Sequence, residues 1–349
     1  MKQRQNILSA PSTELPDPIE LVEEADVDAD VELREVDISS ELHGERMDRA
    51  LALLLPEFSR SFAQQLLTEQ SVTRLLPQIA VVTKASTKVR LGERYSVSLR
   101  PTPQSQAFQP EAMPLHVVHE DADLRVIHKP AGLVVHPAPG NWRGTLLNGL
   151  LALDPQAVML PRAGIVHRLD KDTSGLMVVA RTRRAMDALV AMIAAREVHR
   201  EYLAVGYRAW NGPVQREVEA AIGRDTRNRL RMAVVDLTRQ SGKEAQTTFQ
   251  KLTSQENACL VQCTLHTGRT HQIRVHMAYI GHPLLGDALY AGPMQLGIER
   301  QALHAFRLSF AHPVTGQALK FEAPLPPDMA QLLTDLKLDG VTPNEGSLG

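Results

Sequence analysis

Residues 164–181 read GIVHRLDKDTSGLMVVAR, a charged segment between two apolar runs. The runs GIV and GLMVVA predict two buried strands, and the segment between them carries His167, Arg168 and Asp170. A loop that is anchored at both ends holds its side chains in fixed positions, which a reacting group requires. An arginine held against Asp170, for which Arg168, Arg269 and Arg274 are the candidates, would keep its carboxylate ionised. We therefore expect the functional site at this loop, with Asp170 as its candidate nucleophile.

The segment DKDTSG (170–175) begins like a calcium-binding loop, but the match fails further along. Position twelve of such a loop requires a bidentate glutamate, and Arg181 stands there instead. The flanking runs also predict strands, whereas a calcium loop of this kind joins two helices. We therefore exclude calcium and interpret Asp172 as a turn residue.

Three other site types are excluded by their missing partners. HRLD is similar to the catalytic loop of protein kinases, but the chain has no glycine-rich loop and no DFG. Ser174 lies in TSG rather than in the GxSxG of a hydrolase elbow. His266, His271 and His276 fall five apart, so they do not share one helix face as the histidines of HExxH do. We expect no metal at the site.

The charge of the chain is unevenly distributed along its 349 residues, which are enough for two domains. Residues 1–48 hold 14 acidic and 4 basic side chains, whereas residues 113–325 hold 25 basic and 18 acidic ones. A basic body favours a polyanionic partner.

The sequence carries no signal for a membrane or for secretion. No apolar run approaches the roughly 20 residues that span a bilayer, and the N-terminus lacks an apolar signal segment. Cys259 and Cys263 do not form a CxxC pair and indicate reduced thiols in a core. We expect a cytoplasmic protein that acts as a monomer.

Composition divides the chain into five segments. Residues 1–40 are acidic and contain prolines, which predicts a disordered tail. Helical spacing begins at Met47, Ser59 is a candidate N-cap for a second helix, and IAVVTKAST and RYSVSL predict a hairpin after it. The predicted segments are the tail (1–40), this small α+β module (41–100), a Pro- and Gln-rich linker (101–112), a large domain (113–330) and a C-terminal tail (331–349).

Strand-like runs recur in the large domain. They are LHVVH, LRVIHK, GLVVH, GLMVVART, YLAVGY, ACLVQCTL, RLSF and LKFEA. Helical spacing is found at residues 182–198 and 271–280. Strands with few helices at irregular intervals predict an α+β fold with a mixed sheet rather than a doubly wound one.

The segment RAGIVHRLDKDTSGLMVVART (162–182) closely resembles the signature of the RluA-type pseudouridine synthases, in particular of the RluD-like branch that modifies large-subunit ribosomal RNA. Further motifs match in the same order, namely VIHKPAGLVVHP (126–137), REYLAV (200–205), TGRTHQIRVHMA (267–278), HPLLGDALY (282–290) and ALHAFRLSFAHPVTG (302–316). The small module is similar to the S4-type RNA-binding domain of this family. The family's Asn-Gly turn is missing from it, since residues 71–82 read SVTRLLPQIAVV.

The resemblance implies a largely antiparallel central sheet with flanking helices, and isomerisation of uridine to pseudouridine without metal or cofactor. Asp170 matches the family's essential aspartate, which acts at the ribose or at the base. Tyr202 matches the tyrosine that stacks on the base and moves a proton from C5, and Arg274 matches the residue that pairs with the aspartate. Arg168 matches the residue that fills the space left by a flipped-out uridine.

Other basic residues are candidates for RNA contact. They are His167, Arg269 and three arginines of GRDTRNRLRM (223–232), namely Arg227, Arg229 and Arg231. A solvated loop is the alternative interpretation of residues 223–232. The expected partner is large-subunit ribosomal RNA or a ribosomal precursor particle. A non-catalytic RNA-binding or ribosome-assembly factor, and the same isomerase acting on tRNA, remain the alternatives.

Overall fold

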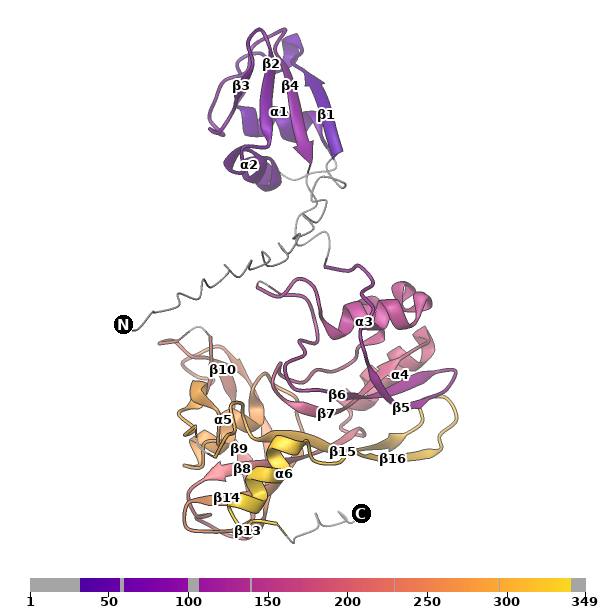
Figure 1. Ribbon diagram of the computed structural model, residues 1–349, viewed down its shortest axis with the longest axis vertical. Coiled ribbons are helices and arrows are strands. Elements are labelled where there is room, and N and C mark those ends of the chain that lie inside the picture. Colours follow the sequence, from indigo (N-terminus) through magenta and orange to yellow (C-terminus); the bar gives the residue numbers. More distant parts are fainter. Residues whose placement is uncertain are drawn as a thin grey trace, which may run out of the picture. The chain divides into compact units, whose positions relative to one another are not determined.

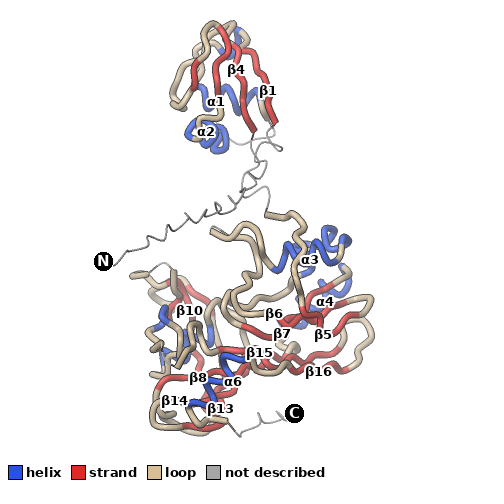
Figure 2. Tube along the Cα trace, viewed as in Figure 1, coloured by secondary structure: helices blue, strands red, loops and turns tan. Residues whose placement is uncertain are grey.

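The structure of the chain, a computed structural model, describes residues 32–56, 60–99, 107–138, 140–228, 230–294 and 296–339. The chain divides into two compact units, within residues 1–102 and 103–349. Figure 1 traces the elements of both, and Figure 2 distinguishes their helices, strands and loops by colour. No helix in the described ranges is long and apolar enough to cross a membrane.

The N-terminal unit is a four-stranded antiparallel sheet with two helices. Its elements are β1 (Glu32–Asp37), α1 (Met47–Leu54), α2 (Arg60–Thr68), β2 (Val72–Leu76), β3 (Ala80–Val81) and β4 (Arg94–Leu99). The strand order is β1-β4-β2-β3. Both predicted helices are present, and Met47 and Leu51 of α1 are buried in the core of the unit. Ser59, the predicted N-cap, lies outside the described residues.

Two details of this unit differ from the prediction. Residues 32–37 form β1 rather than part of a tail, and β1 pairs with β4 along its whole length. Only Val36 of this strand is buried, so its charged residues carry no apolar alternation that the sequence would reveal. The predicted hairpin is also wrong, because β3 pairs with the unpredicted strand β2 and not with β4.

The larger unit is built on a large sheet. Its strands are β5 (His116–Glu120), β6 (Leu124–Lys129), β7 (Ser174–Ala180), β8 (His199–Tyr207), β9 (Gln215–Glu219), β13 (Gln246–Ser254), β14 (Ala258–Leu265), β15 (Leu303–Ala311) and β16 (Ala318–Glu322). Within the described residues they form nine strands in the order β5-β6-β7-β15-β8-β14-β13-β9, with β16 paired to β15. Among the strands that the structure describes, β7 and β15 are the one pair that runs in parallel. The predicted mixed, largely antiparallel sheet is therefore confirmed.

Helices and a second small sheet complete the larger unit. The helices are α3 (Leu146–Leu153), α4 (Arg183–Ala194), α5 (Gln272–Tyr279) and α6 (Pro327–Asp335), and the small sheet contains β10 (Ile222–Arg224), β11 (Met232–Val234) and β12 (Gly242–Lys243). The helices predicted within residues 182–198 and 271–280 are present as α4 and α5.

The apolar run GLVVH (132–136) is not a strand, against the prediction. The backbone carbonyls of Val134 and Val135 instead accept hydrogen bonds from the amides of Leu146 and Leu147. These amides belong to the first turn of α3, where backbone N–H groups have no partner inside the helix. The run therefore supplies hydrogen-bond acceptors to the N-terminal amides of α3, and the side chain of Val135 is buried in the core.

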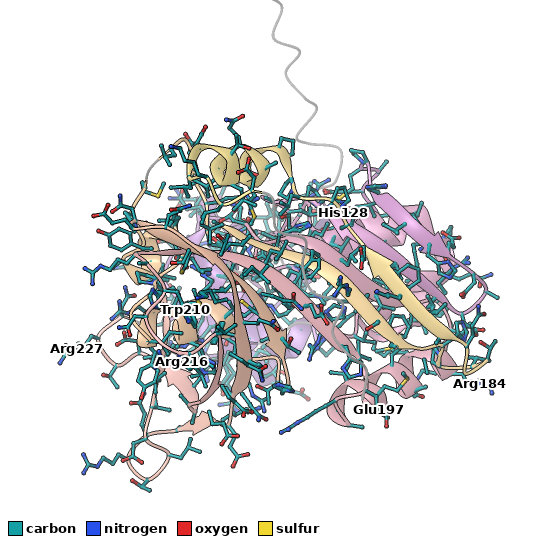
Figure 3. All side chains as sticks on the ribbon, turned by 90° about the horizontal axis from the view of Figure 1, so that it is seen from below. His128, Arg184, Glu197, Trp210, Arg216 and Arg227 are labelled. Carbon is teal, nitrogen blue, oxygen red and sulfur yellow. The ribbon has the colours of Figure 1, made fainter. Side chains whose placement is uncertain are left out.

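The predicted C-terminal tail begins too early. Helix α6 extends to Asp335, and Leu332, Leu333 and Leu338 are buried with residues of β8 and β15. Figure 3 shows α6 in yellow on one side of the sheet. Residues 331–338 of the predicted tail thus contribute to the core, and its residues 340–349 lie outside the described chain.

Strand β8 separates two cores by its alternation. Leu203 and Val205 pack with α6, whereas Tyr202 and Ala204 pack with residues of α5. Successive side chains of a strand point to opposite faces of the sheet. Arg200 consequently lies on the same face as Tyr202.

Candidate active site

A cleft of about 650 Å³ opens in the larger unit beside the charged loop. Its walls come from the loop, the end of α4, the start of β8 and the segment that leads into α5. The charged residues that line it are Asp170 and six arginines, namely Arg162, Arg168, Arg196, Arg200, Arg269 and Arg274. This excess of positive charge suits a polyanionic ligand.

The charged loop is anchored differently from the prediction. The run GIV is not a strand, because it ends a 3-10 turn (Pro161–Gly164) and makes a single bridge from Ile165 to Val179 of β7. Gly164 has a φ of +79°, and a Cβ there would lie 2.0 Å from the carbonyl oxygen of Ala180. The backbone therefore passes against β7 at a point where only glycine fits.

Two basic side chains hold the backbone of the loop. The Lys129 ammonium, fully buried, donates hydrogen bonds to three carbonyl oxygens, one of them that of Lys171 at 2.9 Å. Burial lowers the pKa of Lys129 to about 7. Arg300 donates to the carbonyl oxygen of Asp172 at 3.0 Å and pairs with Asp328 of α6 at 2.6 Å. The start of α6 thus helps to hold the candidate active-site loop.

Asp170 lies at the cleft with one of its carboxylate oxygens engaged. Oδ2 accepts a hydrogen bond from Arg274 at 3.1 Å, and the His271 Nε2 lies 3.9 Å away. Oδ1 has no hydrogen-bond partner among the described residues. The side chain retains 18 % of its exposure. A carboxylate that is held at one oxygen and open at the other is suited to attack a ligand in the cleft.

Arg274 is fixed by a second carboxylate behind it. Its Nε and a terminal nitrogen donate to the two oxygens of Asp287 at 2.7 and 2.8 Å, and both side chains are buried. Burial disfavours the charged form of Arg274, but the hydrogen bonds and charges of Asp287 and Asp170 outweigh it and raise its pKa. The guanidinium therefore stays charged and presents its other terminal nitrogen to Asp170.

His271 and Tyr290 form the wall beside this pair. The His271 Nδ1 lies 2.9 Å from the Tyr290 hydroxyl, and the Arg274 guanidinium lies 5.0 Å from the centre of the Tyr290 ring. Burial lowers the pKa of His271, which keeps the ring neutral at pH 7. The tyrosine ring thus packs behind both Arg274 and His271.

Tyr202 lines the cleft from the middle of β8 and is only 4 % exposed. Burial raises the pKa of its hydroxyl to about 12, although the charge of Arg200 opposes the rise. The phenol is therefore protonated and neutral at pH 7. Its position in the wall allows contact with a planar ligand.

Arg168 and His167 differ although they are neighbours. Arg168 is exposed in the cleft wall. The His167 Nε2 accepts a hydrogen bond from the amide of Val178 at 3.0 Å, and burial lowers the pKa of the ring to about 3. His167 is therefore neutral and bound to β7, so it offers no positive charge to RNA.

The remaining predicted RNA contacts are scattered. Arg269 lines the cleft and donates to the carbonyl oxygen of Glu244 at 2.9 Å. Arg231 pairs with Asp225, and Figure 3 shows Arg227 at the periphery, pointing outward. Neither of these two lines the cleft, and Arg229 lies outside the described residues.

Sequence reasoning did not assign several residues that the structure places at the site. They are Lys129, Arg200, Asp287, Tyr290 and Arg300. The first four lie inside the motifs that carry the family resemblance, but these motifs by themselves assign no role to them. Arg300 lies just outside such a motif, and its contact crosses 128 residues of sequence.

One group of potential metal ligands occurs in the described part of the chain, and it lies away from the cleft lining. Asp121, Asp123 and His312 bring their ligand atoms within 4.8 Å of one another. Asp121 already accepts hydrogen bonds from the amides of Asp123 and Leu124 and contacts His119 and His312. These bonds explain the cluster as the support of the turn between β5 and β6.

Comparisons with known proteins show what the chain is similar to. Residues 123–279 match a family model described as RNA pseudouridylate synthase. The chain is 47% identical over 318 residues to Ribosomal large subunit pseudouridine synthase D of Neisseria meningitidis, with 86% of this chain and 80% of that protein covered. Its identity to the protein of the same name from Nitrosomonas europaea is 45%, with 87% and 88% covered.

A solved structure is also similar. The human protein called RNA Pseudouridylate Synthase Domain Containing 4 aligns with a TM-score of 0.50 and 25% identity, covering 64% of this chain and 93% of the human one. The sequence motifs, the sheet and these relatives agree, and the chain belongs to the RNA pseudouridylate synthase family, isomerases that convert uridine to pseudouridine in RNA.

Proposed function

We propose that this chain modifies uridines of large-subunit ribosomal RNA and that Asp170 is the group that attacks the nucleotide. The observation that carries the proposal is the Asp170 carboxylate, held by Arg274 at one oxygen and open at the other in a cleft lined by arginines. The names of two relatives, which align over 80% and 88% of their lengths, support the target.

The protonation states of the site support this chemistry. Arg274, whose pKa is raised, donates a hydrogen bond to Oδ2 of Asp170 and places its positive charge beside that carboxylate. In the reaction the bond between N1 and C1′ breaks, a bond between C5 and C1′ forms, C5 loses a proton and N1 gains one. Asp170 attacks the ribose or the base so that the bond between N1 and C1′ opens, and the bond between Asp170 and the nucleotide breaks again as the product forms, which restores the carboxylate. Tyr202, neutral at pH 7, stacks on the uracil and relays the proton that C5 releases.

We propose that Arg168 fills the space that the target uridine vacates when it leaves the RNA stack. A uridine inside a stem or structured loop must leave its stack before its glycosidic bond is accessible. Arg168 is exposed in the cleft wall, and a planar guanidinium stacks on bases while it contacts phosphate. Arg168→Ala should therefore slow turnover about tenfold more on a structured stem-loop than on an unstructured RNA. Single-turnover rates on both RNAs measure this, and equal losses would contradict the role.

The proposal as a whole is tested with Asp170→Asn. We expect pseudouridine formation to fall by at least about a thousandfold while RNA affinity changes little, because the variant keeps the shape and loses the nucleophile. Release of tritium from RNA labelled at uridine C5 measures the rate, and filter binding measures the affinity.

Asp187→Asn is the matched control. Asp187 is exposed on α4, pairs with Arg183 and does not line the cleft, so the same loss of charge should leave the rate unchanged. In a strain that lacks the gene, wild type should restore pseudouridine in the large-subunit RNA and Asp170→Asn should not. Full restoration by Asp170→Asn would refute the assigned role, and pseudouridine found only in tRNA would refute the target. RNA binding by the wild type without any product would favour an assembly factor.

We further propose that the enzyme acts as a cytoplasmic monomer and uses neither metal nor cofactor. The charges that the cleft needs come from its own arginines and Asp170. Both cysteines are buried free thiols, as expected of a protein in a reducing compartment. Activity that persists in EDTA, and a sedimentation mass of one chain, are the expected results.

The N-terminal unit is proposed as an RNA-binding module of S4 type. Arg46 and Arg60 project from it half-exposed, and both are oriented by the buried Asp48. Such a pair of arginines is available to phosphates.

A further inference from the structure

Arg200 differs from the other arginines of the cleft in being buried without a counter-ion. It is 7% exposed, and no described residue forms a hydrogen bond or ion pair with its guanidinium. Its Nε is fully enclosed, whereas the side chain as a whole helps to form the cleft wall. A buried charge without a partner is unfavourable for the free protein.

The other cleft arginines are compensated or solvated. Arg274 has Asp287 and Asp170, and Arg196 donates to the side chain of Gln246. Arg168 is exposed and therefore hydrated. Of the arginines that line the cleft in the described chain, Arg200 thus combines burial with the absence of a partner.

The surroundings of Arg200 leave room for a ligand and place it near the nucleotide. Arg200 precedes Tyr202 by two residues on the same face of β8, and its charge acts on the hydroxyl of Tyr202 and on the ring of His167. A Cβ at position 268 would lie 3.0 Å from a terminal nitrogen of Arg200. Gly268 therefore keeps the guanidinium free of a neighbouring side chain.

We propose that Arg200 binds a backbone phosphate of the RNA next to the nucleotide that Tyr202 contacts. A phosphate supplies the missing negative charge and accepts two parallel hydrogen bonds from a guanidinium, whereas a neutral base carbonyl compensates no charge. The inference rests on an RNA substrate, as in the proposed function, and adds the group that this side chain recognises.

The test combines Arg200→Met with RNA that carries one uncharged methylphosphonate at each phosphate around the target uridine in turn. Arg200→Met should weaken binding about ten- to a hundredfold, the effect of one charge-assisted contact. The slope of log affinity against log salt should fall by about 0.7 to 0.9. One methylphosphonate should weaken the wild type equally and leave Arg200→Met unaffected, because the two changes remove the same contact. Arg184→Met is the matched control, since Arg184 is exposed at an end of the molecule (Figure 3), and it should change affinity less than twofold.

Protein stability separates ligand binding from a structural role. Arg200→Met should melt at or above the temperature of the wild type, because it removes an unpaired buried charge. Arg200→Lys, which keeps the charge and loses the fork, should show intermediate affinity. Additive losses at every phosphate, or a lower melting temperature with unchanged affinity of the folded protein, would overturn the proposal. A wild type that binds RNA through this contact but forms no pseudouridine would refute the proposed function and leave the phosphate site intact.

Discussion

Two aspartates of this chain, Asp48 in the N-terminal unit and Asp170 in the larger one, are both held by arginines, but to different degrees. Asp48 is fully buried and accepts five hydrogen bonds, from Arg46, Arg60 and Gln64. Asp170 accepts one hydrogen bond, from Arg274, and retains access to the cleft. The same pair of residue types therefore serves packing in one unit and is available for chemistry in the other.

The two sites differ in whether the carboxylate still has an oxygen free to accept a hydrogen bond. At Asp48 the carboxylate is saturated, and the hydrogen bond of Arg46 lowers its pKa despite burial. At Asp170 the arginine is fixed instead, because Asp287 accepts hydrogen bonds from two of its nitrogens. A saturated carboxylate stabilises a fold, whereas an open carboxylate beside a fixed arginine can react with a ligand.

The largest effect is expected when Arg274 of the active site loses the carboxylate that fixes it. Asp287→Asn should lower kcat about a hundredfold, because Arg274 loses its charged support and no longer holds Asp170 in one position. The Kd for RNA should change less than about threefold. Steady-state kinetics with a binding assay measures the split.

A smaller effect is expected at the packing aspartate. Asp48→Asn should destabilise the N-terminal unit by about 2 kcal/mol, because a buried carboxylate loses charged hydrogen bonds while its arginines remain partly hydrated. Hydrogen exchange of the α1 and α2 amides should become faster in the full-length chain. The turnover of RNA already bound should not change, and a loss of kcat comparable to that of Asp287→Asn would remove the distinction between the two aspartates.

The pH dependence of hydrogen exchange in the N-terminal unit provides the control for Asp48→Asn. The pKa of Asp48 is lowered in the folded unit, so its contribution is complete above the unfolded value near 3.9 and is lost as the pH falls further toward the folded pKa. Exchange in the wild type should therefore accelerate below about pH 4, toward the rate of Asp48→Asn. A variant as sensitive to acid as the wild type would assign the effect to other carboxylates.

The sequence predicted a strand correctly where the side chains on both faces of the strand are buried. All seven residues of β7 are buried, and the corresponding apolar run was assigned as a strand. The same reasoning was wrong for GLVVH and GIV, because an apolar run is also used to cap α3 or to pass against β7. Strand β1 was missed for the opposite reason, since it is an edge strand with one buried residue.

The sequence by itself determined the family, the order of the motifs, the α+β class and the position of Asp170, because these depend on local residue types and spacing. Only the tertiary structure decided the environment of each charge. It gave Arg274 two carboxylates, bound His167 to β7 and left Arg200 buried without a partner. Burial and pairing arise from contacts between segments far apart in the chain. They decide whether a charged side chain stabilises the fold or is available to bind a ligand.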